Sequence, residues 1–178
     1  MSLVPSGSQT VGPFFNFGLT ANQRLGVMAG EGALGDRIRL AFQVIDGEGV
    51  PTAGDSMIEL WQADSEGRYE NGDPAFCGFG RLETQADGTC VFETVRPGRV
   101  DGQAPHITVL VFGRGLQKQL HTRVYFAGDP ANAQDSVLVL VPESRRSTLL
   151  AQPVDGHPGL WRMEIRLQGQ NETIFFDV

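Results

Sequence analysis

The sequence predicts an all-β protein, specifically an antiparallel two-sheet β-sandwich with long loops and little helix. Two observations carry this prediction. Short apolar segments recur along the chain, several of them with alternating polarity. The 23 glycines and 10 prolines fall between these segments rather than in one block, which is typical of a protein with many turns. Because antiparallel sheets must cover one face against another, we favour a sandwich, and a barrel is the alternative.

The 178 residues are expected to form one domain, residues 1–178, of which residues 1–35 are an extended N-terminal arm and a loop. The arm segment, residues 7–20, mixes turn residues with three phenylalanines. The glycine-rich segment 21–35 allows one short helix at most.

The first strand is expected over Arg37–Ile45, where alternate apolar residues share one sheet face. The later strands follow from Asp-Gly turn signals, β-branched residues and, over 136–141, a nearly continuous apolar run expected to be buried on both faces. These strands are expected over residues 56–63, 89–95, 106–112, 120–126, 136–141, 160–167 and 173–178. A short helix is expected around residues 143–150.

Composition excludes several classes of function. The net charge of −7 and the absence of clustered lysine and arginine argue against a nucleic-acid-binding protein. No stretch approaches the roughly 20 apolar residues of a membrane span, and the first residues do not resemble a secretory signal. Cys77 and Cys90 belong to no metal-binding pair and are expected to be free thiols. A cytoplasmic protein is therefore expected.

Residue types alone do not identify a reaction. His106, His121 and the two tyrosines are chemically able to bind a ferric ion, but no HxH or HxxxH spacing places two imidazoles on one face. Thr108 stands two residues after His106, where a second imidazole would be needed. Arg114, between two glycines, has the chemistry to bind a planar anion or to point into water from a turn.

Six segments together resemble the intradiol ring-cleavage dioxygenases. They are SQTVGPF at 8–14, IELWQADSEGRYEN at 58–71, FGRLETQADGTCVFETVRPG at 79–98, APHITVLVF at 104–112, LHTRVYFAGDP at 120–130 and MEIRLQGQNETIFFDV at 163–178. The resemblance implies a β-sandwich core and non-haem Fe(III) chemistry. It is greatest to the two-chain dioxygenases that cleave protocatechuate, in which an α-type chain works with an iron-bearing β-type chain.

In that family the β-type chain binds Fe(III) through two tyrosines and two histidines. Tyr69 and His106 match one ligand of each kind, whereas Val100 and Thr108 stand at the other two ligand positions. The resemblance therefore implies an α-type chain in which Tyr69 and His106 are vestigial, with no metal and no catalytic residue of its own. The Fe(III) would be held by the partner β chain.

The resemblance also implies that an α-type chain helps to close the substrate pocket of its partner. The matching positions here are Thr10, Gly12, Pro13 and Arg114. The implied reaction joins protocatechuate and O2 to give 3-carboxy-cis,cis-muconate, in a large hetero-oligomer of α and β chains.

Two alternatives remain open at this point. The first is a stand-alone intradiol dioxygenase with altered iron ligands, using Tyr69, His106, Tyr125 and His121. The second is a non-enzymatic β-sandwich module that binds carbohydrate or is similar to transthyretin.

Overall fold

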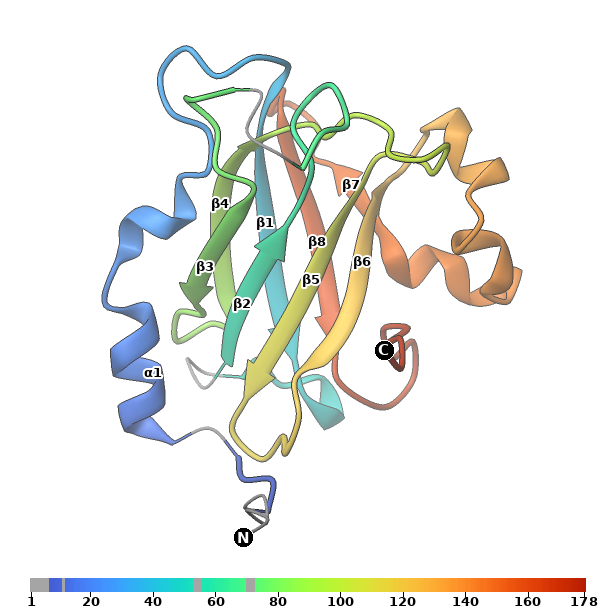
Figure 1. The fold of residues 1–178 in the computed structure, drawn as a ribbon. Coiled ribbons are helices and arrows are strands. Elements are labelled where there is room, and N and C mark those ends of the chain that lie inside the picture. The colour runs from blue at the N-terminus through green and yellow to red at the C-terminus, as the bar shows by residue number, and fades with distance from the viewer. Residues whose placement is uncertain (1–6, 11, 53–55, 70–72) are drawn as a thin grey trace, which may run out of the picture.

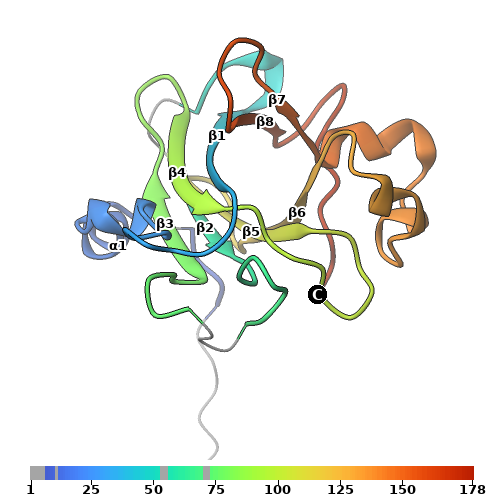
Figure 2. The ribbon, with the colours of Figure 1, turned by 90° about the horizontal axis from the view of Figure 1, so that it is seen from above.

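The computed structural model describes residues 7–10, 12–52, 56–69 and 73–178 and contains one eight-stranded sheet (Figure 1). The strands lie in the order β3-β2-β5-β6-β7-β8-β1-β4. Their bounds are β1 Arg37–Ile45, β2 Ser56–Trp61, β3 Phe79–Glu83, β4 Thr89–Val95, β5 His106–Gly113, β6 Leu120–Phe126, β7 Leu150–Pro153 and β8 Leu160–Arg166. Viewed from above, the sheet curls round its core and almost closes (Figure 2). The prediction of a mostly β protein with little helix is confirmed.

The predicted arrangement of two antiparallel sheets is not what the structure contains. The short strand β7 pairs in parallel with β6 and antiparallel with β8, so it joins the two halves into one nearly closed, barrel-like sheet. The pair β1–β8 is also parallel. The sheet is therefore mixed, because β8 pairs antiparallel with β7 on one side and parallel with the first strand β1 on the other.

The core lies inside this curled sheet. In β1 the burial of side chains follows the predicted two-residue period. Phe42 and Phe92 meet edge to face with ring centroids 6.0 Å apart. Burial of each such large apolar side chain contributes about 1.5–3 kcal/mol. A second, smaller cluster beside β6 contains Tyr125, Leu138 and Leu149.

The helical segments are short. They are α1 Pro13–Thr20 and the 3-10 helices η1 Gln23–Gly26, η2 Gly47–Gly49, η3 Pro130–Gln134, η4 Leu138–Leu140 and η5 Glu143–Leu149. The helix η5 confirms the short helix expected around residues 143–150, and η1 is a single short helix within segment 21–35, which was expected to contain one at most. In the described part of the chain, no helix is long and apolar enough to cross a membrane.

Three predicted elements are wrong. Segment 13–20, expected to be extended, is the helix α1, which begins at a proline whose fixed φ suits a first helical turn. Segment 136–141 is not a strand, because the carboxylate of Asp135 accepts hydrogen bonds from the backbone N–H groups of Val137 and Leu138 and bends the chain into η4. Segment 173–178 makes only an isolated bridge, between Phe176 and His121.

Candidate functional site

The N-terminal arm is fastened to the turn between β5 and β6. The Thr10 hydroxyl accepts a hydrogen bond from the backbone N–H of Gly115 at 2.7 Å and donates one to the carbonyl of Gly113 at 3.5 Å. Figure 1 shows the arm passing beside this turn before α1 begins. Two predicted segments, the arm and the turn that carries Arg114, therefore lie together.

A pocket of about 430 Å³ lies at this junction. Its lining includes Thr10 and Gly12 of the arm and Lys118 of the turn; the other lining residues are Gln9, Phe112, Gly113, Leu116, Gln117 and Gln119. Arg114 is exposed on the same turn, outside this lining, and the side chain of Pro13 lies outside the described structure. Sequence reasoning missed Lys118. The signal available was that this is the one lysine in the chain and that it closely follows Arg114.

The positions matched to metal ligands lie elsewhere, on the outer face of β5 and the adjoining loops. His106 is opposite Tyr125 on β6, and Thr108 is opposite Arg123. The structure therefore places an arginine directly across from the position where the second histidine is missing. Tyr69 is 54% exposed, and Val100 is half-buried.

A hydrogen-bonded network connects these strands to the helices that follow β6. The Arg123 guanidinium donates to Gln103 Oε1 at 2.7 Å and to Tyr125 Oη at 3.4 Å. Tyr125 Oη in turn donates to Asp135 Oδ1 at 2.9 Å. The Nδ1 of His106 lies 2.8 Å from the carbonyl oxygen of Ala104. His106 and Tyr125 are therefore held in defined positions by protein partners.

The pKa values of the network follow from burial and from this arginine. Burial raises the pKa of Tyr125 to about 12, so the phenol is neutral at pH 7. Burial also raises the pKa of Tyr69, against the opposing influence of Arg123. For His106, burial lowers the pKa, and the charge of Arg123 acts in the same direction. Burial acts to raise the pKa of Asp135, but its hydrogen bonds outweigh burial and lower it.

These residues do not fit a ferric ion. Such an ion needs anionic donors directed at it, but the Tyr125 hydroxyl is directed at Asp135, to which it donates a hydrogen bond at 2.9 Å. The carboxylate of Asp135 already accepts four hydrogen bonds. Val100 has no donor atom, and the permanently charged Arg123 lies across from Thr108. Within the described ranges, no group of three or more His, Cys, Asp or Glu side chains is placed to hold a metal.

The alternative ligand set with His121 is also contradicted by geometry. His121 and Tyr125 are four residues apart on β6, which separates their Cα atoms by about 13 Å along the strand. His121 also lies beside the C-terminal segment through its bridge to Phe176. The two side chains therefore do not converge on one metal.

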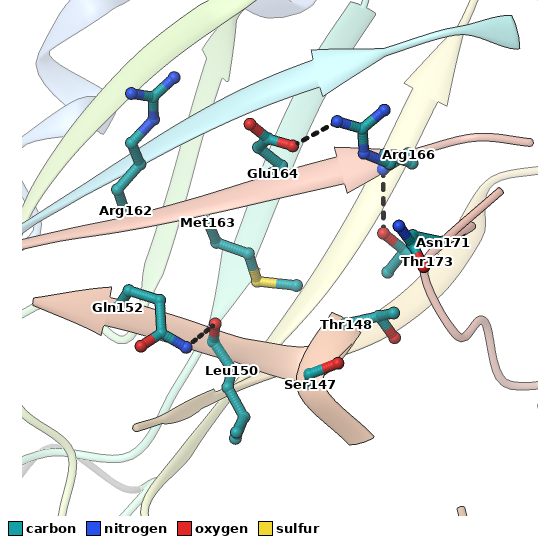
Figure 3. A pocket seen from close by; sticks show the side chains of 10 residues that line it. All are labelled: Ser147, Thr148, Leu150, Gln152, Arg162, Met163, Glu164, Arg166, Asn171 and Thr173. Carbon is teal, nitrogen blue, oxygen red and sulfur yellow. Dashed lines mark hydrogen bonds and ion pairs between the residues drawn. The ribbon is translucent and has the colours of Figure 1, made fainter. Parts of the chain in front are cut away.

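A second pocket, of about 500 Å³, lies between β7, β8, η5 and the C-terminal segment (Figure 3). Its two arginines already have partners, since Arg166 pairs with Glu164 at 2.8 Å and Arg162 donates to Gln43 Oε1 at 2.7 Å. No residue of the predicted site lines this pocket.

Replacing Thr10 by valine should release the arm from the β5–β6 turn. The exposed N–H of Gly115 would lose its acceptor, and an intramolecular hydrogen bond typically contributes about 0.5–1.5 kcal/mol. We expect amide hydrogen exchange at Gly115 to become about 2- to 10-fold faster. Thr10→Ser keeps the hydroxyl and should exchange like the wild type. Equal exchange rates of the Gly115 amide in all three proteins would show that the Thr10 hydroxyl does not clamp the arm to the turn.

The buried imidazole of His106 predicts an acid-sensitive fold. Because its pKa is lowered from 6.5 in the folded state, the unfolded chain binds the proton more readily. The contribution to stability is therefore present above pH 6.5 and is lost as the pH falls through the folded-state value. Denaturant titrations at several pH values below neutrality should show this fall in the free energy of unfolding. His106→Gln should show a shallower fall, and an unchanged slope would refute the assignment.

Comparisons with known proteins agree with this geometry. A family model described as "Dioxygenase" matches residues 10–158. The alpha chain of protocatechuate 3,4-dioxygenase from Burkholderia cepacia is 41% identical, over 99% of this chain and 99% of its own length. The beta chain from the same organism is 33% identical, over 94% of this chain and 77% of its own length. The dioxygenase domain of a carbohydrate-binding fusion protein from Streptomyces sp. SirexAA-E superposes with a TM-score of 0.66 at 26% identity, covering 80% of this chain and 86% of that domain.

Proposed function

Because this chain belongs to the intradiol dioxygenase family, we propose that it is the α-type chain of a two-chain enzyme that cleaves protocatechuate with O2 to 3-carboxy-cis,cis-muconate. The non-haem Fe(III) is held by the partner β chain, since the residues at the corresponding positions here do not fit the ion. When bound in the partner, this iron makes the catechol reactive toward O2. The α-type chain binds and orients the substrate at the edge of the partner's pocket.

The observation that carries this proposal is the clamp between the N-terminal arm and the β5–β6 turn, which the Thr10 hydroxyl forms with Gly113 and Gly115. Thr10 joins two segments that are 105 residues apart in the sequence, and both belong to the set expected to face the substrate. The clamp gives Gly12 a fixed place beside the turn. A backbone without side-chain bulk at this point suits a wall against a flat aromatic ring.

Positive charge on the turn supports an aromatic carboxylate as substrate. Arg114 and Lys118 lie on the same β5–β6 turn, in a chain whose net charge is −7. Such a local positive field attracts and orients an anion before it reaches the partner's iron. The α-type chain itself moves no proton in this scheme. Its contributions are binding energy, orientation and exclusion of water.

Substitution of Arg114 tests the proposal in the reconstituted α–β complex. We expect Arg114→Ala to lower kcat/KM for protocatechuate by about 10- to 100-fold, mostly through KM, because a charge-assisted contact contributes about 1.5–3 kcal/mol. Arg114→Lys should recover part of the loss. Arg162→Ala, on the distant strand β8, is the matched control and should behave like the wild type.

The same experiment has two outcomes that would contradict the proposal. If purified β chain turns over protocatechuate equally well without this chain, the α-type role is wrong. If the complex requires this chain but Arg114→Ala leaves both KM and kcat unchanged, the role of Arg114 is wrong. Catechol, which lacks the carboxylate, should be affected less than protocatechuate by Arg114→Ala.

A further inference from the structure

One permanent cation lies among the groups that match iron ligands. Arg123 is opposite Thr108 in the β5–β6 register, and Thr108 is flanked on its other side by Trp61 of β2. The guanidinium reaches Tyr125 Oη at 3.4 Å. The imidazole of His106 lies beside Tyr125, with ring centroids 5.8 Å apart. Arg123 therefore contacts one potential donor, Tyr125, which packs beside a second, His106.

Two hydrogen bonds hold the Arg123 guanidinium in place, one to Gln103 Oε1 and one to Tyr125 Oη. Gln103 Oε1 accepts from the guanidinium at 2.7 Å. Asp135, which is connected to Arg123 through Tyr125, accepts from the Tyr125 hydroxyl and from three backbone N–H groups of the described chain. A partly buried cation with such partners is costly to displace, because moving it would leave acceptors unsatisfied.

We propose that Arg123 takes the place of the ferric ion in this chain, and that its guanidinium bars iron independently of the two missing ligands at Val100 and Thr108. Electrostatics supports this step. Two cations in one site repel each other strongly at partly buried positions, so restoring the ligands would not restore the metal while Arg123 remains. The inference uses the family's ligand positions from the proposed function, but it concerns the isolated chain and does not depend on the role of Arg114.

The test compares four forms of the full-length chain. They are the wild type, Val100→Tyr/Thr108→His, the same pair with Arg123→Gln, and the same pair with Arg162→Gln as the matched control for loss of an arginine. Each is incubated with Fe(III) citrate, desalted and analysed for iron content and for the visible absorption of an iron–tyrosinate complex. We expect bound iron to rise at least about 10-fold only when Arg123 is replaced.

Two results would overturn the proposal. If the Val100→Tyr/Thr108→His variant, which retains Arg123, binds iron, the guanidinium is no barrier to the metal. The second result is equal, negligible iron binding when Val100→Tyr/Thr108→His is combined with either Arg123→Gln or Arg162→Gln. If circular dichroism shows that both triple variants are folded, Arg123 does not prevent iron binding.

A milder pair of variants keeps the test decisive if the tyrosine at position 100 disrupts folding. Thr108 is half-buried, so Thr108→His is more easily accommodated, and it places two imidazoles two residues apart on one face of β5. We expect Thr108→His/Arg123→Gln to bind Co²⁺ at least about 10-fold more tightly than Thr108→His. Equal affinities would overturn the proposal. Activity of the α–β complex is measured separately, so failure here leaves the α-type role intact.

Discussion

Replacing Asp135 by alanine is expected to lower the free energy of unfolding by about 3–5 kcal/mol. The side chain is fully buried, and its two oxygens accept hydrogen bonds from Tyr125 Oη and from the backbone N–H groups of Ala104, Val137 and Leu138. Each donor left without an acceptor costs about 1–3 kcal/mol. Entry of water and local relaxation recover part of the sum, which sets the upper limit.

Urea titration of the purified chain measures this loss. Asp135→Asn keeps the shape but removes the charge and one acceptor, so it should fall between alanine and the wild type. Asp87→Ala is the matched control, because that exposed carboxylate also accepts from a backbone N–H, that of Thr89, and should cost less than about 1 kcal/mol. A loss below about 1 kcal/mol for Asp135→Ala would contradict the role of the network.

The same carboxylate has a pH signature. Its pKa is lowered from 3.8 in the folded state, so its contribution to stability is present above pH 3.8 and is lost as the pH falls through the folded-state value. The alanine variant should lack this part of the acid transition. The wild type and Asp135→Ala should therefore differ less in stability at low pH than at neutral pH.

The strand predicted from a regular two-residue period is β1, and residues 37–45 match its bounds. Periodicity works there because burial on one side of a strand depends on local spacing alone. The prediction over 136–141 rested on a continuous apolar run, and it is wrong because the buried carboxylate of the preceding residue, Asp135, dictates a turn.

The strands β3 and β7 were not predicted, because neither has a clear local sequence pattern. In β3 the inward position 80 is a glycine, because a Cβ there would lie 2.7 Å from the sulfur of Met28, and the apolar alternation is therefore hidden. The strand β7 has only four residues and ends in a proline. Its two partners come from distant parts of the chain, so the connection that turns two sheets into one had no local signal.

The residues of the candidate site also fall into two groups: those that sequence motifs identified and those that only the folded structure reveals. Motifs identified Thr10, Gly12, Tyr69, His106 and Arg114 as positions of interest. They did not identify Arg123 or Asp135, because the importance of these residues depends on what lies across a strand or beyond a turn. The register that sets Arg123 against Thr108 requires the folded sheet.

Alanine at Gly98 is expected to destabilise the chain by about 2–4 kcal/mol. This glycine lies where the loop that carries Val100 passes the loop that carries Tyr69. An added Cβ would meet the backbone N of Gly67, would lie 2.6 Å from the carbonyl oxygen of Ser65 and would lie 2.7 Å from the carbonyl carbon of Glu66. All three neighbours are backbone atoms, so no side-chain rotation relieves the overlap.

Hydrogen bonds join the loop that carries Val100 to the loop that carries Tyr69, so a displacement at Gly98 would also disturb the Tyr69 loop. The Asp64 carbonyl accepts from the N–H of both Gly67 and Gly98, and the Asp64 carboxylate accepts from the backbone and side chain of Arg68. Separating the loops therefore breaks the turn that presents Tyr69. Gly67 is fixed in the same way, since it has φ +83° and a Cβ there would overlap the carbonyl oxygen of Arg99.

Gly18→Ala provides the matched control for Gly98→Ala. Gly18 lies in the helix α1, where an added Cβ meets no atom within 4 Å, and alanine favours a helix by up to about 1 kcal/mol over glycine. Thermal unfolding should therefore show a lower Tm for Gly98→Ala and an equal or higher Tm for Gly18→Ala. The two loops must touch backbone to backbone for this difference to appear. If both variants had the same Tm as the wild type, the close contact between the loops that carry Tyr69 and Val100 would not exist in solution.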